Sequence, residues 1–237
     1  MSAAVQALRG KRAVLLDALG TLVELVPPAP ALVRALERRL GLAVTERDAE
    51  RAIGAEIAYY RGHLDEGRDA ASLAELRRRC ARVMGEALVG GAGSSELEEE
   101  ALTAALMESL RFRAYPDAPA ALSALRERGL RLVVVSNWDV SLPEVLERVG
   151  LRPALDAVVT SAAVGARKPA PEIFQAGLRA AGVAAAEALH VGDGPEEDLA
   201  GARAAGIDAL LIARHRAGGR PATAAAIASL AELAGQV

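Results

Sequence analysis

Asp17 ends a run of apolar residues and is the first candidate for chemistry in this 237-residue chain. The run, residues 13–16, is typical of a buried strand, and the Gly20 and Thr21 that follow turn the backbone and offer N–H and hydroxyl groups. Open α/β sheets bind their ligands at the carboxyl ends of the strands. A carboxylate held there can act as a nucleophile or as a metal ligand.

Three further predicted strands also run into polar residues. These are Ser136, Asn137 and Trp138 after strand 131–135, Lys168 in the loop after strand 156–160, and Asp193 and Asp198 after strand 188–192. If the strands are parallel, these side chains gather at one edge of the sheet together with Asp17. Two carboxylates, a hydroxyl and an ammonium suit a phosphate and a divalent cation, and Mg²⁺ prefers oxygen ligands. Asp198 also suits a second role, as an acid in the first turn of a helix.

Helices and strands alternate from Tyr115 to the end of the chain. The pattern predicts helices at 117–128, 141–149, 171–181, 196–205 and near 222–233, and strands at 131–135, 156–160, 188–192 and 208–212. Such alternation predicts a parallel sheet covered by helices on both faces. The first strand, 12–17, belongs to the same sheet. We therefore expect an α/β fold with a Rossmann-like, doubly wound parallel core.

A helical block interrupts this core after the first strand. Pro27, Pro28 and Pro30 predict a stiff linker, and residues 31–110 show only helical patterns. Four helices are predicted, at 31–40, 46–64, 70–89 and 95–110, with a loop at 90–93 and a cap at Ser94-Ser95 before the last. We expect a small helical cap domain over 25–112, inserted into a core domain of 1–24 plus 113–237.

Composition narrows the class of protein. The net charge of −3 leaves no basic field for nucleic acid, and no apolar run approaches the roughly 20 residues that span a bilayer. The single cysteine, Cys80, excludes an internal disulfide, and residues 1–12 lack the apolar region of a signal peptide. We expect a cytoplasmic protein, monomeric or homodimeric, that binds neither nucleic acid nor membranes.

The ordered motifs resemble those of the haloacid dehalogenase superfamily of hydrolases, most of which are phosphatases. The first motif is Asp17-Ala-Leu-Gly-Thr21, the second Ser136-Asn137, the third Lys168-Pro169, and the fourth Gly192-Asp193 with Asp198 five residues on. Each motif is weak by itself, whereas four in order are specific, and the likeness covers nearly the whole chain. The position of the helical block matches the subgroup with a small cap after the first strand.

The resemblance implies a role for each motif. Asp17 would attack phosphorus to give an aspartyl-phosphate, and Lys168 would pair with Asp17 and with the developing negative charge. Mg²⁺ would be held by Asp17, the backbone carbonyl of Leu19 and Asp193, with Asp198 nearby. Ser136 and Thr21 would bind the phosphoryl oxygens. Beside the resemblance, we expect Asn137 to bind the substrate and Trp138 to form an apolar wall that faces it. The implied substrate is a small phosphorylated metabolite.

Leu19 departs from the family pattern, in which phosphatases carry a second Asp at this position. That Asp protonates the leaving oxygen and later activates water, work worth roughly 10²–10⁴ in rate. Leu can do neither, so the expected enzyme favours acyl, aryl or anhydride phosphates, whose leaving groups need no proton. Asp139 and Glu24 are the nearest candidates for a replacement base.

Three variations on the family also lack this Asp. Haloacid dehalogenases, which work without metal, have Tyr there and an Arg-containing halide site; Arg34 could supply the Arg, but the acidic fourth motif favours a metal. Phosphonoacetaldehyde hydrolases need a cap Lys, and residues 31–110 contain none. Transport ATPases have Thr there and a long-lived aspartyl-phosphate. We expect an Mg²⁺-dependent phosphohydrolase, with a dehalogenase or a non-catalytic binding or regulatory protein as alternatives.

Overall fold

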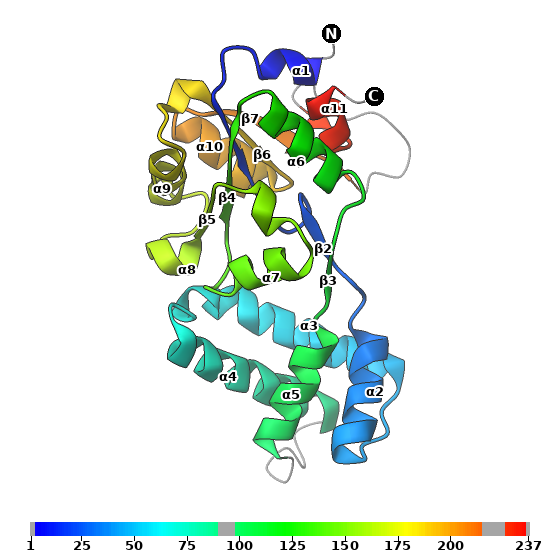
Figure 1. Ribbon diagram of the computed structural model, residues 1–237. Coiled ribbons are helices and arrows are strands. Elements are labelled where there is room, and N and C mark those ends of the chain that lie inside the picture. The colour runs from blue at the N-terminus through cyan, green and yellow to red at the C-terminus, as the bar shows by residue number, and fades with distance from the viewer. Residues whose placement is uncertain (1–2, 90–97, 215–225, 236–237) are drawn as a thin grey trace. The chain divides into compact units, whose positions relative to one another are not determined.

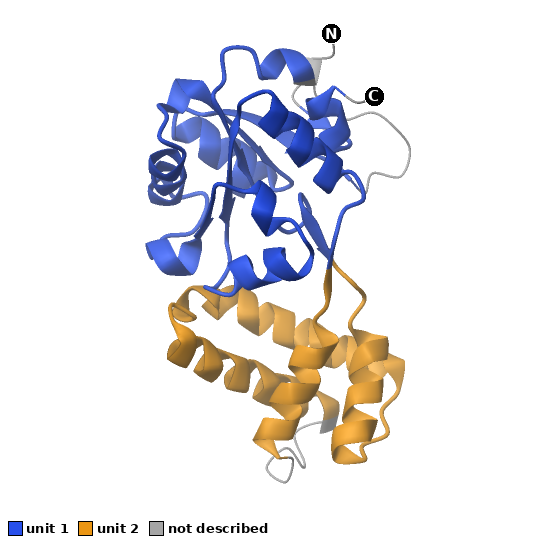
Figure 2. Ribbon diagram, in the orientation of Figure 1, with its two compact units in different colours: residues 1–24, 113–237 blue, residues 25–112 orange. Residues whose placement is uncertain are grey.

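The computed structural model describes residues 3–89, 98–214 and 226–235. The chain divides into two compact units, one of residues 1–24 and 113–237 and the other of residues 25–112 (Figure 2). The first unit is an α/β domain and the second is helical. Within the described residues, no helix combines the length and the apolar character that a membrane crossing requires.

A six-stranded parallel sheet forms the centre of the α/β unit (Figure 1). Its order is β5-β4-β1-β6-β7-β8. The strands are β1 (Ala13–Leu16), β4 (Arg131–Ser136), β5 (Ala157–Thr160), β6 (Ala188–Gly192), β7 (Asp208–Ile212) and β8 (Ala226–Ile227). The chain moves from β1 outward to β4 and β5 and then crosses to β6 on the other side of β1. Ligand crevices form where the order reverses in this way, at the carboxyl ends of the strands.

Helices cover both faces of this sheet, as the alternating pattern predicts. One face packs on α9 (Pro171–Ala181) and α10 (Gly201–Ala204), through a core that includes Leu15, Val133 and Phe174. Figure 1 shows α6 (Ala118–Glu127) and α7 (Leu142–Arg148) on the opposite face. The helix α11 (Leu230–Ala234) packs against α6. The predicted Rossmann-like α/β core is confirmed.

Short elements complete this unit. They are α1 (Ala3–Ala7), α8 (Ser161–Val164), the single turns η3 (Arg152–Ala154) and η4 (Ala185–Glu187), and the π-helix η5 (Pro195–Ala200). The strands β2 (Val23–Leu25) and β3 (Phe112–Ala114) form a separate two-stranded sheet. Both of these strands span the boundary between the two units, so the chain passes from one unit to the other within them.

Two of the predicted helices in this unit are wrong in part. The helix predicted near 222–233 is instead β8 followed by the short α11, and residues 222–225 lie outside the described part. The helix predicted at 196–205 begins as the π-helix η5 and becomes α-helical only at Gly201. The wider turns of a π-helix often occur at functional sites, and η5 carries Asp198.

The helical unit packs around its own apolar core. Its helices are α2 (Ala29–Leu40), α3 (Glu46–His63), the turn η1 (Leu64–Glu66), α4 (Ala70–Val89) and α5 (Glu99–Ser109). Leu32, Leu76 and Leu106, from three of the helices, are fully or almost fully buried in this core. The predicted linker at 27–30 is wrong in part, because α2 begins at Ala29 with Pro30 in its first turn, where proline is tolerated. The predicted loop at 90–93 and the Ser94-Ser95 cap lie outside the described residues.

Candidate active site

Asp17 lies directly after β1, and one of its oxygens is held by two donors. Ser136 Oγ donates to Asp17 Oδ1 at 2.9 Å, and Lys168 Nζ donates to the same oxygen at 2.6 Å. Ser136 is the last residue of β4, the neighbour of β1 in the sheet. Burial raises the pKa of Asp17 above its usual value, and Lys168 opposes that rise. In the described part of the chain, both of these side-chain bonds go to Oδ1 and leave Oδ2 without one.

Lys168 carries a buried ammonium shared between two carboxylates. Its Nζ lies 2.6 Å from Asp17 Oδ1 and 2.6 Å from Asp198 Oδ1, and the residue is only 2% exposed. Burial disfavours the charge, but the two carboxylates outweigh it and raise the pKa of Lys168 to about 12. The ammonium is therefore a fixed positive charge beside Asp17.

Asn137 fixes the backbone from which Lys168 extends. Its side-chain nitrogen donates to the Lys168 carbonyl at 3.1 Å, and its oxygen accepts from the Lys168 N–H at 2.7 Å. The sequence predicts that Asn137 binds the substrate. In the structure its side chain binds the protein's own loop and holds the ammonium in place.

Asp198 is nearly buried on η5, with hydrogen bonds to both oxygens. Oδ1 accepts from Lys168 and lies 2.8 Å from His190 Nε2, while Oδ2 accepts from the Gly194 N–H at 2.9 Å. Burial tends to raise the pKa of Asp198, but the bonds from His190 and Lys168 outweigh it and hold the pKa well below its usual value. Asp198, an acid in the first turn of η5, is thus an ionised group bonded to Lys168, the partner of Asp17.

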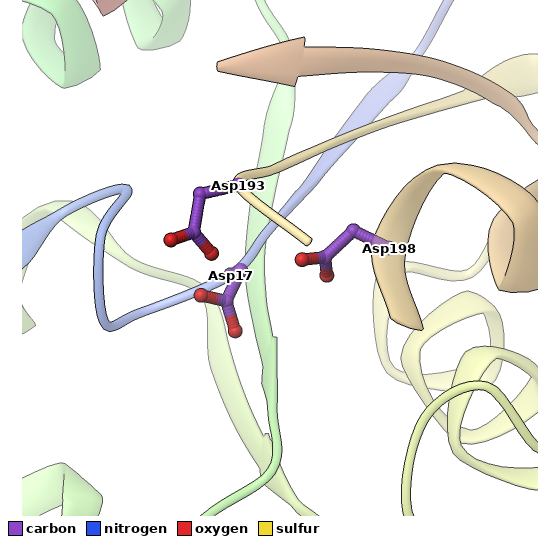
Figure 3. Close-up of side chains that lie close together, drawn as sticks. All are labelled: Asp17, Asp193 and Asp198. Atoms are coloured by element: carbon purple, nitrogen blue, oxygen red, sulfur yellow. The ribbon is translucent and has the colours of Figure 1, made fainter. Parts of the chain in front are cut away.

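Asp193 is the exposed member of the carboxylate group. One oxygen each of Asp17, Asp193 and Asp198 can be chosen so that all lie within 4.8 Å of one another (Figure 3). Partial burial, with the negative charges of Asp17 and Asp198, raises the pKa of Asp193 to about 6. A Cβ on Gly20, whose φ is +78°, would lie 2.1 Å from Asp193 Oδ2, so only glycine allows this approach.

Leu19, Thr21 and Trp138 occupy the loops beside this group. Leu19 is 38% exposed, so an apolar side chain stands in solvent two residues after Asp17. Thr21 is fully buried, and its hydroxyl has no hydrogen-bond partner among the described residues. Trp138 is 7% exposed, and its backbone N–H donates to Ser161 Oγ at 3.2 Å.

Asp139 and Glu24, the candidate replacement bases, have structural partners. Asp139 Oδ1 accepts from the Ser141 N–H at 2.7 Å before α7, and Glu24 forms an ion pair with Arg113 at 2.7 Å. In this structure the Asp139 carboxylate thus accepts a backbone hydrogen bond, and the Glu24 carboxylate pairs with an arginine.

A family model described as a haloacid dehalogenase-like hydrolase matches residues 11–206. This chain belongs to that family. The resemblance inferred from the four motifs is confirmed at this level.

Relatives of this hydrolase family include two phosphatases. The chain is 40% identical to the phosphoserine phosphatase of Thermus thermophilus over 134 residues, which are 56% of this chain and 54% of that protein. It is 32% identical to the phosphoglycolate phosphatase of Rhodospirillum rubrum, over 85% of this chain and 79% of that protein. The chain spans 36% to 54% of the length of several relatives with 40% identity or more.

A solved structure of the family has the same fold. The HAD phosphatase of Thermococcus onnurineus is 28% identical, with a TM-score of 0.62 over 94% of this chain and 95% of that one. The matched part of this chain includes residues of both units.

The residues of this family member fit a hard divalent cation. The donor atoms are carboxylate oxygens, which Mg²⁺ prefers. Burial, and after it the negative charges of Asp17 and Asp198, raises the pKa of Asp193. Lys168 forms ion pairs with two of these three carboxylates, and a bound cation would supply a further positive charge to the group.

Sequence reasoning missed Arg214, which holds the loop of Thr21. Its Nε donates to the Thr21 carbonyl at 3.1 Å, its Nη1 lies 2.8 Å from Asp117 Oδ1, and the guanidinium lies 3.8 Å from the ring centre of Tyr115. Its position two residues after strand 208–212 was the available signal, because the other polar residues of the site also follow strands. The sequence left open whether residues 214–221 form only a surface loop. Of these, Arg214 holds the Thr21 loop, and residues 215–221 lie outside the described part.

Proposed function

We propose that this chain is an Mg²⁺-dependent phosphohydrolase that acts on a small phosphorylated metabolite through an aspartyl-phosphate on Asp17. The observation that carries the proposal is the arrangement of Asp17, whose Oδ1 is held by Ser136 and Lys168 while Oδ2 has no such bond from the residues that the structure describes. The phosphatase relatives support a phosphorylated substrate. The whole network belongs to the α/β unit, to which we assign the chemistry.

In the first step, Asp17 Oδ2 attacks phosphorus, the new O–P bond forms, and the bond from phosphorus to the leaving oxygen breaks with its electron pair. Lys168 stabilises the negative charge that builds on the phosphoryl oxygens, since its ammonium is already in place beside Asp17. Ser136 keeps the carboxylate in one orientation, and the unpaired Thr21 hydroxyl can donate to a phosphoryl oxygen. When bound, Mg²⁺ supplies charge neutralisation for the phosphoryl group.

We assign the Mg²⁺ site to Asp17, Asp193 and the backbone carbonyl of Leu19, with Asp198 at its side. Loss of the side-chain carboxyl at position 19 does not remove a ligand, because only the backbone of that residue is needed. Asn137 contributes by holding Lys168. We assign to Trp138, the residue after Asn137, the role of an apolar wall for the substrate.

Leu19 determines which leaving groups the site can expel. The departing oxygen takes the electron pair, and Leu19 has no proton to give it. The leaving groups of aryl, acyl and anhydride phosphates depart without a proton, whereas the alkoxide of an alkyl ester needs one. The second step, attack of water on the aspartyl-phosphate, also lacks a base at position 19, so the phosphorylated enzyme is expected to persist.

The test is phosphate release from an aryl and an alkyl phosphate, each with Mg²⁺ and with chelator, with Asp17→Asn as the blank. We expect metal-dependent and Asp17-dependent release from the aryl ester alone. Equal release from both esters would contradict the leaving-group argument. Release that persists in the Asp17→Asn variant would contradict the proposal.

A dehalogenase is the second candidate, because Leu19 is equally compatible with a halide that leaves without a proton. Asp17 would then form an alkyl ester with no metal. Release of chloride from a 2-haloacid that chelator does not affect would establish this alternative. An absence of both activities would point to a binding or regulatory protein.

A further inference from the structure

His190 is a fully buried imidazole that the proposed reaction does not use. It lies in the middle of β6, between Leu15 of β1 and Ala209 of β7 in the sheet. Its ring meets Phe174 edge to face, with 5.2 Å between ring centres. Its Nε2 lies 2.8 Å from Asp198 Oδ1.

The direction of this hydrogen bond follows from the acceptor. Asp198 Oδ1 also receives the Lys168 ammonium at 2.6 Å, so the oxygen belongs to an ionised carboxylate that can only accept. The His190 Nε2 must therefore carry the hydrogen and donate it. The second nitrogen, Nδ1, is buried with no hydrogen-bond partner among the described residues. An apolar ring at this position would avoid the cost of burying that nitrogen, so the Nε2 bond is what the imidazole contributes.

Asp198 packs directly against strand β6. His190 and Gly192 are two residues apart and so project to the same face of the strand. A Cβ on Gly192 would lie 2.1 Å from Asp198 Cγ, which shows that the carboxylate rests directly against the strand backbone. The same face thus supplies both the space for the carboxylate and a donor aimed at it.

The donors around Asp198 fix the plane of its carboxylate. Lys168 and His190 share Oδ1, and the Gly194 N–H binds Oδ2. Without His190, the bonds from Lys168 and Gly194 remain, but one buried lone pair loses its donor and the group can turn toward the ammonium. A turn there changes how Lys168 is shared between Asp198 and Asp17.

We propose that His190 is a positioning residue, which through Asp198 sets the place of Lys168 and the geometry of the cation site. The inference rests on the proposed function for the identity of the cation. Hydrogen bonds to ligating carboxylates of this kind typically account for about 10–100-fold in metal affinity or activity.

The experiment compares three variants. In His190→Phe the ring and its packing on Phe174 are kept without a donor. In His190→Gln the amide nitrogen falls where Nε2 lies, and in His190→Asn it falls where Nδ1 lies. We measure Mg²⁺ affinity by titration calorimetry, kcat and KM for an aryl phosphate, and the urea midpoint as a check on folding.

We expect His190→Phe and His190→Asn to bind Mg²⁺ about 10–100-fold more weakly and to lose kcat, while His190→Gln retains both. Unchanged Mg²⁺ affinity and kcat in His190→Phe would overturn the proposal, and so would equal losses in the Gln and Asn variants. If His190→Phe does not fold, the Gln and Asn pair decides. Failure of the parent protein to bind Mg²⁺ would instead overturn the cation site, and with it the proposed function.

Discussion

Lys168 keeps its charge in the protein interior because Asp17 and Asp198 share it. Removal of one partner from a buried ionic group leaves uncompensated charge, which typically costs roughly 3–5 kcal/mol. We expect Lys168→Met to lower the free energy of unfolding by about this amount and to abolish phosphate release. Urea unfolding measures the first effect, and the double variant Lys168→Met with Asp198→Leu should recover part of the stability. A single variant as stable as the parent would contradict this account of the network.

Leu19 is the second residue whose replacement is informative, since here a substitution should add activity. We expect Leu19→Asp to raise kcat for an alkyl phosphate by up to roughly 10²–10⁴-fold, because the new carboxyl can protonate the leaving oxygen. The aryl ester should gain less. Leu19→Asn, of nearly the same size but without an acidic proton, is the matched control. Equal gains in the Asp and Asn variants would show that size or polarity at this position, rather than acid catalysis, limits the rate.

At the scale of the loop after β1, an alanine at position 20 would have two effects, a clash with Asp193 and strain in the backbone. Gly20→Ala places a Cβ 2.1 Å from Asp193 Oδ2 and also puts alanine at a φ of +78°. Gly129 has the same φ with nothing within 4 Å, so Gly129→Ala reports the backbone cost alone, about 1–2 kcal/mol. We expect both variants to lose stability, and only Gly20→Ala to lose about 100-fold or more in kcat/KM, through displacement of Asp193. Similar kinetic losses in both would refute a specific role for this close approach.

The elements themselves show which parts of the fold the sequence can predict. The strands β4, β5, β6 and β7 lie within a residue of their predicted bounds, because a parallel strand covered on both faces must be a continuous apolar run. The strands β2, β3 and β8 have two or three residues each, too few to show a period, and the alanine-rich stretch near β8 predicts helix instead.

The candidate site, too, could be predicted only in part from the sequence. Topology alone predicts that Asp17, Ser136 and Asp193 meet at one edge, since each ends a strand of one parallel sheet. It does not predict that Lys168 bridges Asp17 and Asp198, because that contact depends on the path of a loop and on the π-helical turn of η5.

At the scale of the whole molecule, the helical unit contains a titratable group that the proposed chemistry does not use. Glu56 of α3 is 3% exposed, and burial raises its pKa to about 7, against the opposing hydrogen bond with Cys80 of α4. Between the unfolded value of 4.5 and about 7, the native state keeps a proton that the unfolded chain has released. The unfolded state then binds fewer protons, so stability falls as pH rises through this range and is constant above it.

This linkage predicts that Glu56→Gln stabilises the helical unit at pH 8 by up to about 3 kcal/mol, because glutamine has no charge to bury. Near pH 4.5 the advantage should vanish, since glutamate is then protonated in the native state as well as partly in the unfolded chain. Hydrogen exchange of the α3 and α4 amides at both pH values measures this unit without relying on a global transition. Glu50→Gln, at an exposed position of the same helix, is the control and should change neither value. Equal hydrogen-exchange protection in Glu56→Gln and the parent at pH 8 would contradict this prediction. It would mean that burial of the ionised Glu56 carboxylate does not destabilise the helical unit.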